Sequence, residues 1–83
     1  MEVGDFNFKN QSYRGAELRF RDALNYKPNE PEAIFKLAES LSKLAENAEA
    51  KEKYEKYLSL EPKGSHAASA KAALQRLSSP TQK

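Results

Sequence analysis

The side chains that could do chemistry in this 83-residue chain are few, and their spacing does not favour catalysis. His66 is the single histidine, and it stands beside Gly64 and Ser65 with no acidic or nucleophilic partner next to it in the sequence. A general acid or base needs a positioned partner, and a metal site needs several ligands at suitable spacing. We therefore expect His66 to be a solvent-facing or groove residue at the start of a helix.

The carboxylates Glu46, Glu49, Glu52 and Glu55 are interleaved with lysines. Such alternation is typical of the solvated face of a helix and not of an acid–base pair. The sequence has no phosphate-binding glycine loop, nucleophile elbow or dinucleotide fingerprint. It also has no cysteine, which excludes thiolate chemistry, disulfides and zinc sites built on cysteine. We expect no enzymatic activity and no cofactor.

The charge balance gives no reason to expect a polyanionic partner, because 14 basic residues against 12 acidic ones leave a net charge of +2. One cluster of arginines and aromatics could suggest nucleic-acid binding, but acidic residues break it and its aromatics are needed for the core. Its members are Tyr13, Arg14, Arg19, Phe20 and Arg21, interrupted by Glu17 and Asp22. We expect no nucleic-acid partner.

No apolar run approaches the length that spans a membrane, so we expect no membrane insertion. The first five residues are acidic where a signal peptide would be basic and then apolar. We expect a cytoplasmic location. A periplasmic protein whose leader had been removed would have the same sequence.

Apolar residues recur at steps of three and four, as on one face of a helix, and most clearly at Ile34, Leu37, Leu41 and Leu44. Prolines and cap-forming residues separate these segments, and no alternating strand pattern competes with them. We predict an all-α chain with helices over about residues 2–10, 12–28, 31–45, 47–60 and 65–77.

Six positions recur after an interval of 34 residues. Small residues let two helices approach closely, an aromatic one turn further fills the gap between them, and a proline ends the second helix of the pair. Gly4, Ala16, Phe20, Ala23, Leu24 and Pro28 correspond to Ala38, Ala50, Tyr54, Tyr57, Leu58 and Pro62. Over about residues 1–62 the sequence resembles the tetratricopeptide repeat (TPR) family, whose antiparallel helix-turn-helix units stack into an α-solenoid.

The resemblance implies one domain over residues 1–77, with about five helices. Residues 1–30 would form an N-terminally truncated repeat, 31–64 a complete repeat and 65–77 a capping helix, followed by a disordered tail over 78–83. The sequence departs from the family pattern at Ile34, where a large aromatic is usual, and at Tyr57, where the earlier unit has Ala23. We expect Tyr57 to pack against the thin side chains of the cap, Ala67, Ala70 and Ala73.

TPR proteins usually hold a peptide on the concave face formed by the first helix of each unit. An exposed Phe35 flanked by Lys36 and Lys43 would suit a segment with apolar anchors and acidic residues. The alternative is that Phe8 and Phe35 pack between repeats while the charges only solvate the face. The predicted partner-binding residues are Asp5, Phe8, Lys9, Glu32, Phe35, Lys36, Glu39, Ser42, Lys43, His66 and Ser69.

One ligand class of the family is not expected. Chaperone-adaptor TPR domains grip a C-terminal carboxylate with basic and asparagine side chains, but the matching positions here hold Phe35 and Glu39. The carboxylate clamp is therefore missing.

The N-terminal edge is the second predicted surface. Its short first helix would leave apolar residues partly uncovered, and either a second copy of the chain or upstream repeats could cover them, unless they fold back locally. The predicted self-association residues are Val3, Phe6, Phe8 and Leu18.

Two functions follow from these surfaces. The first is a protein-interaction scaffold that binds a partner on its concave face and forms a homo-oligomer. The alternative is a purely structural assembly protein with no foreign peptide ligand. The segments YLSLEP and HAASAKAALQRL resemble those of bacterial TPR proteins.

Overall fold

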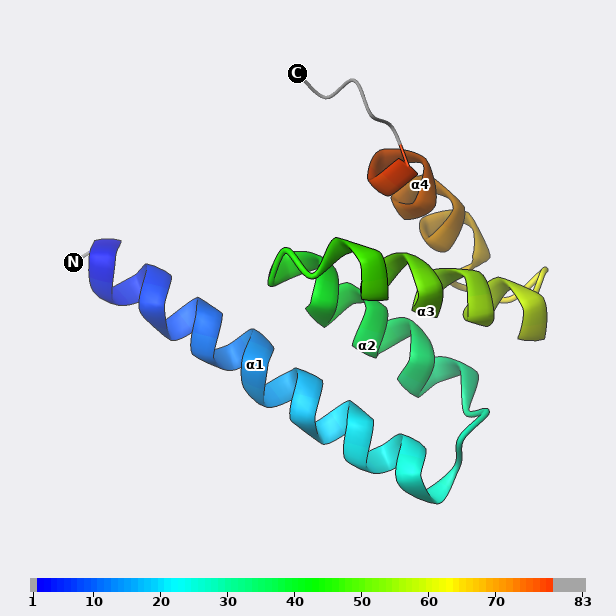
Figure 1. Cartoon of the computed structure of the whole chain (residues 1–83), viewed down its shortest axis with the longest axis horizontal. Helices are drawn as coiled ribbons and strands as arrows, with labels where there is room; N and C mark the ends of the chain where they lie inside the picture. Colours follow the sequence, from blue (N-terminus) through cyan, green and yellow to red (C-terminus); the bar gives the residue numbers. More distant parts are fainter. Residues whose placement is uncertain (1, 79–83) are drawn as a thin grey trace.

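The computed structural model describes residues 2–78, with side chains described for residues 12–77, and this part of the chain forms four α-helices (Figure 1). Each helix packs antiparallel against the next one along the chain. The predicted all-α class is confirmed, with four helices in place of about five. Their bounds are α1 Glu2–Tyr26, α2 Pro31–Lys43, α3 Asn47–Leu60 and α4 Ala67–Ser78.

The two helices predicted for residues 2–10 and 12–28 are one continuous helix, so the prediction of a break between them was wrong. The segment around Ser12 contains neither glycine nor proline at the expected turn, and a short helix gains stability when it is extended without interruption. Helix α1 ends where the Lys27 N–H donates to the Ala23 carbonyl at 3.0 Å, directly before Pro28. The N-terminal unit therefore has no antiparallel pair of helices within the described residues.

Helix α2 begins with Pro31 in its first turn and ends in a Schellman motif. The Glu46 N–H donates to the Leu41 carbonyl at 2.8 Å, and the Ala45 N–H donates to the Ser42 carbonyl at 3.1 Å. Ala45 has φ 66°, in the left-handed region where glycine is the usual residue. This tight turn returns the chain into α3 antiparallel to α2.

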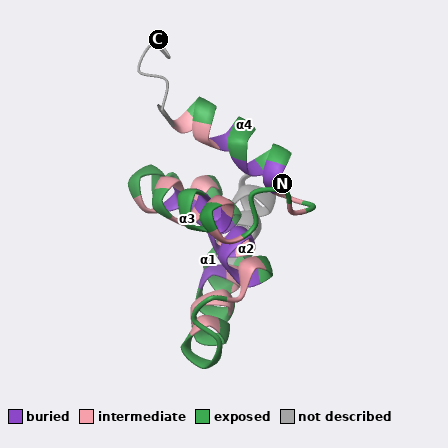
Figure 2. Cartoon of the chain, turned by 90° about the vertical axis from the view of Figure 1, so that its right-hand side faces the viewer, coloured by how far each residue is buried: buried purple, intermediate pink, exposed green. Residues whose placement is uncertain are grey.

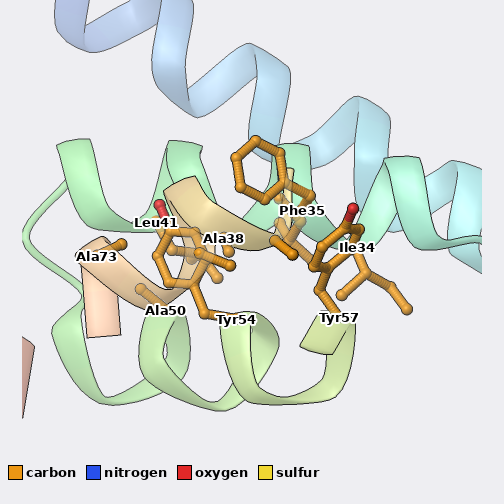
Figure 3. Close-up of a cluster of buried hydrophobic side chains, with 11 residues drawn as sticks. Ile34, Phe35, Ala38, Leu41, Ala50, Tyr54, Tyr57 and Ala73 are labelled. Carbon is orange, nitrogen blue, oxygen red and sulfur yellow. The ribbon is translucent and has the colours of Figure 1, made fainter. Parts of the chain in front are cut away.

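The core lies around α2, whose Ile34, Leu37 and Leu41 are fully buried. Figure 2 shows the buried residues concentrated where α2 and α3 meet. The small positions of the repeat, Ala38 and Ala50, are fully buried at this contact, as expected for closely packed helices. Figure 3 shows these alanines in the same cluster as Tyr54, Tyr57 and Ala73 of α4.

The C-terminal part of the core joins α3 to α4. Ala67, Ala70 and Ala73 belong to the same buried cluster as Tyr57, which supports the predicted partnership of a large tyrosine with thin alanines. Gly64 lies against this tyrosine: a Cβ at Gly64 would be 3.3 Å from the Tyr57 Cζ and 2.8 Å from the Glu61 Cβ. Helix α4 begins at Ala67, two residues later than Ser65.

Candidate functional site

The predicted concave face contains a stripe of charged residues along α2. Glu32, Lys36, Glu39 and Lys43 follow one another at steps of four, three and four residues, which places them on one side of the helix. Glu32, Glu39 and Lys43 are exposed, whereas Lys36 and the neighbouring Ser42 are partly exposed. The rest of α2 is largely buried against its neighbours. This stripe is therefore the part of α2 that a partner can reach.

Phe35 is not part of that accessible surface. Its side chain is only 3% exposed, so the prediction of an exposed aromatic on the groove was wrong. Its ring packs against Tyr54 with centroids 5.8 Å apart and against Tyr57 at 5.5 Å. The imidazole of His66 stacks on it at 4.2 Å with an interplanar angle of 5°. Phe35 thus packs mainly against α3 of its own predicted repeat, and His66, just before α4, covers its ring.

His66 connects the start of α4 to the start of α2. Its Nε2 lies 3.1 Å from Glu32 Oε1, and its backbone N–H donates to the Tyr57 hydroxyl at 3.0 Å. The ring is partly exposed, and it has a packing role against Phe35 that the sequence reasoning missed. A signal was available: Glu32 and His66 are 34 residues apart, the repeat interval, and so occupy equivalent positions in successive units.

One charged residue of α2 and one of α4 both affect the pKa of the buried Tyr54. Burial raises the pKa of the Tyr54 phenol, the Glu39 carboxylate raises it further, and the Arg76 guanidinium opposes this rise. Glu39 and Arg76 therefore act on the same buried tyrosine from two helices. Arg76 was not predicted as a site residue because the repeat pattern is lost in the alanine-rich helix. Ser69, which was predicted, is exposed on α4.

The remaining predicted residues divide into two groups. Leu18 is 62% exposed on α1, which leaves it available for an interaction. The side chains of Val3, Asp5, Phe6, Phe8 and Lys9 lie outside the part of the chain whose side chains are described. Binding of a partner at any of the predicted residues stays a prediction.

A second cluster of charges joins α1 to α3. The Arg21 guanidinium donates to both Glu49 oxygens, at 2.9 and 3.0 Å, and its Nε donates to Glu17 at 2.9 Å. Arg14 donates to the other Glu17 oxygen at 2.6 Å, and its Nη2 lies 3.8 Å from Glu46. Glu17 is only 7% exposed, so the two guanidinium groups neutralise a largely buried carboxylate.

This pairing shifts several pKa values. The hydrogen bond from Arg21 lowers the pKa of both Glu17 and Glu49, and Arg14 lowers that of Glu17 further, while burial opposes both shifts. The same bonds raise the pKa of Arg21, led by Glu49. Arg14 and Arg21, considered above as a basic patch, are thus engaged in holding two helices together.

The described residues include no group of three or more potential ligands that could hold a metal ion. None of the helices in residues 2–78 is long and apolar enough to cross a membrane. The candidate site thus consists of three parts. They are the charged stripe on α2, the aromatic cluster around Phe35 near the start of α2, and Arg76 on α4. Such a surface can bind another molecule through shape and charge.

The four helices pack antiparallel in sequence order, and small residues such as Ala38, Ala50 and Ala70 are buried between them. A comparison with protein families matches the tetratricopeptide repeat over residues 7–74. The chain belongs to the tetratricopeptide repeat family, whose repeats are generally non-catalytic modules for protein–protein interaction. Comparisons with curated proteins and with solved structures gave no match.

Proposed function

We propose that this TPR domain binds a segment of a partner protein on the concave face, along the charged stripe of α2 and the facing side of α4. The observation that carries the proposal is the stripe itself: Glu32, Lys36, Glu39 and Lys43 are accessible on a helix that is otherwise largely buried. Membership of the family supports it, since TPR domains are generally interaction modules.

The charges define the kind of segment that fits. Acidic and basic residues alternate along the stripe, so a partner helix or extended segment with charges in the opposite order would be complementary. Arg76, whose charge opposes the effect of Glu39 on the pKa of Tyr54, adds a positive charge on α4. Phe35 is covered by His66, so specificity would come from the charged rim and not from a deep pocket at this phenylalanine.

The test is a capture experiment from the native cell with charge-exchanged variants. Glu39→Lys with Lys43→Glu exchanges the order of two charges on α2, and Glu52→Lys with Lys56→Glu makes the same exchange on exposed positions of α3. Both pairs have the order glutamate, then lysine four residues later, so the net charge and helix spacing are matched. We expect only the α2 variant to lose the partner. Equal retention by both would contradict the proposed face.

We also propose self-association through α1, the helix that carries the predicted N-terminal edge residues Val3, Phe6, Phe8 and Leu18. Leu18 is 62% exposed and Tyr26 is 84% exposed on this helix, and they are the large hydrophobic residues that the described surface exposes most. In the purely structural alternative, this contact would be the whole function. Sedimentation of the full chain over a range of concentrations tests the self-association, and a strict monomer at the highest concentration would rule it out.

The cytoplasmic location stays a prediction.

A further inference from the structure

One face of α1 is exposed in the part of the chain whose side chains are described. Its residues are complementary to the same face of a second copy of the chain. Helix geometry places residues 15, 18, 19, 22, 23 and 26 within an arc of about 140°. All six are exposed, whereas Phe20 and Leu24 on the opposite side are partly buried. The six residues, called the α1 outer face below, are Gly15, Leu18, Arg19, Asp22, Ala23 and Tyr26.

The α1 outer face consists of two neighbouring ridges with a spacing of four residues. Leu18, Asp22 and Tyr26 form a ridge with large residues at its ends. Gly15, Arg19 and Ala23 form a ridge with small residues at its ends. Ridges of this spacing pack into the grooves of a neighbouring helix.

An antiparallel second copy of α1 would pair these ridges position by position. With a two-fold axis at the peptide between Phe20 and Arg21, Tyr26 of one chain faces Gly15 of the other. A Cβ at Gly15 would have no atom within 4 Å, so space for a tyrosine ring is open above it. Leu18 faces Ala23 in the same way, a large residue over a small one.

The same register brings opposite charges together at the centre. Arg19 of each chain faces Asp22 of the other, which gives two ion pairs related by the two-fold axis. Both side chains lie at exposed positions, and neither forms an ion pair with another described side chain. A parallel arrangement would instead place like charges opposite each other. Charge therefore selects the antiparallel pair.

We propose that the second copy of this chain docks on the α1 outer face as an antiparallel, two-fold symmetric homodimer, with Tyr26 over Gly15, Leu18 over Ala23 and Arg19 paired with Asp22. The inference rests on the self-association proposed above and specifies its surface and register. A single helix pair is a small interface, so the dimer is weak and forms at high protein concentration. Each concave face remains free for a partner.

The first test uses charge exchange and sedimentation equilibrium of the full chain. Arg19→Asp alone, or Asp22→Arg alone, places like charges at both central pairs, and we expect the dissociation constant to rise at least about tenfold. The double variant Arg19→Asp with Asp22→Arg restores both pairs and should return the dimer to the level of the natural sequence. Mixing the two single variants should give a heterodimer. A merely structural role of these residues would not produce rescue by the double variant.

The second test uses cysteines, which the natural sequence lacks. The variant Leu18→Cys with Ala23→Cys should form disulfide-linked dimers on oxidation, because residues 18 and 23 face each other across the axis. Within one helix these positions are about 7.5 Å apart along the axis, too far for a disulfide. The matched control is Leu18→Cys alone, whose two copies in the dimer are offset by the same five residues and should not link.

The outcomes separate the two proposals. A strict monomer overturns both self-association and this register, and it would leave the α1 outer face open to an upstream helix or to another protein. An oligomer that none of the α1 variants weakens overturns only the register. Equal cross-linking of the single and double cysteine variants also overturns it, whereas charge rescue together with selective cross-linking supports it.

Discussion

Replacement of Gly64 by alanine should destabilise the domain, although its backbone conformation is one that alanine can adopt. Gly64 is not among the residues with positive φ, so the cost comes from space alone. The added methyl would lie 2.8 Å from Glu61 Cβ and 3.3 Å from Tyr57 Cζ, and it would be closest to the Tyr57 hydroxyl. Ordinary contacts between carbon atoms are about 3.5–4.0 Å, so one side must move by several tenths of an ångström.

The surroundings of Tyr57 restrict that movement. Its side chain is only 2% exposed, it packs against Phe35, and its hydroxyl accepts a hydrogen bond from the His66 N–H. Overpacking in a site of this kind costs about 1–3 kcal/mol. For a domain of this length, each kcal/mol corresponds to a fall in Tm of about 4–8 °C. We therefore expect Gly64→Ala to lower the Tm in a thermal melt followed by circular dichroism.

The matched control is the same substitution at Gly15. This glycine lies within α1, and a Cβ added there would have no atom within 4 Å, so alanine adds helix propensity without a clash. Gly15→Ala should stabilise the domain by about 0.5–1 kcal/mol, measured at a concentration where the chain is monomeric. The two substitutions should thus have opposite signs.

A double-mutant cycle identifies the atom responsible. Tyr57→Phe removes the hydroxyl that the new methyl would meet first, so Gly64→Ala should cost less in the Tyr57→Phe background than in the natural sequence. If Gly64→Ala left the Tm unchanged or raised it, while Gly15→Ala stabilised as expected, the inferred close packing around Gly64 would be refuted.

The remaining predictions concern the α2–α3 turn, the α1–α3 ion pairs and the aromatic cluster. Ala45→Gly should stabilise the domain by about 1 kcal/mol in urea denaturation, because Ala45 occupies a left-handed conformation with φ 66°; an unchanged or lower midpoint would contradict this. Because hydrogen bonds from Arg21 lower the pKa of Glu17 and Glu49, these carboxylates stabilise the fold above their unfolded pKa values of about 4.5, and that stability should be lost as the pH falls through their lower folded values. Arg21→Gln should remove much of this acid dependence in melts between neutral pH and about pH 3, and a curve parallel to that of the natural sequence would argue against the network. Phe35→Ala should cost about 3–5 kcal/mol because it truncates a core aromatic; a folded variant of nearly natural stability that lost only partner binding would restore Phe35 as a groove residue.

Much of the fold could be predicted from the sequence because it depends on local periodicity. The steps of three and four residues predicted helices, most clearly the one that contains Ile34 and Leu41. Prolines and short loops indicated where most of the helices end. The buried alanines Ala38 and Ala50 followed from the 34-residue interval, because a repeat places equivalent small residues at equivalent helix contacts.

The site was less predictable, because burial depends on how many neighbours cover a helix. The periodicity of α2 identified a core side and an outer side, but Phe35 lies between them and is buried because two tyrosines of α3 pack against it and His66 stacks on it. The bond between Glu17 and Arg21 is local, but the pairing of Arg21 with Glu49 joins residues 28 positions apart and needs α1 and α3 to be placed together. Sequence pattern cannot supply such a distance.

The sequence by itself determined an all-α TPR chain, since helix formation and close packing of repeats are encoded by spacing and residue size. Only the tertiary structure decided that α1 is one continuous helix from Glu2 to Tyr26, that Phe35 is covered, and which face of α1 stays open. The physical reason is that local spacing sets which side of a helix is apolar, whereas the packing of other helices against it sets how much of that helix remains accessible to a partner.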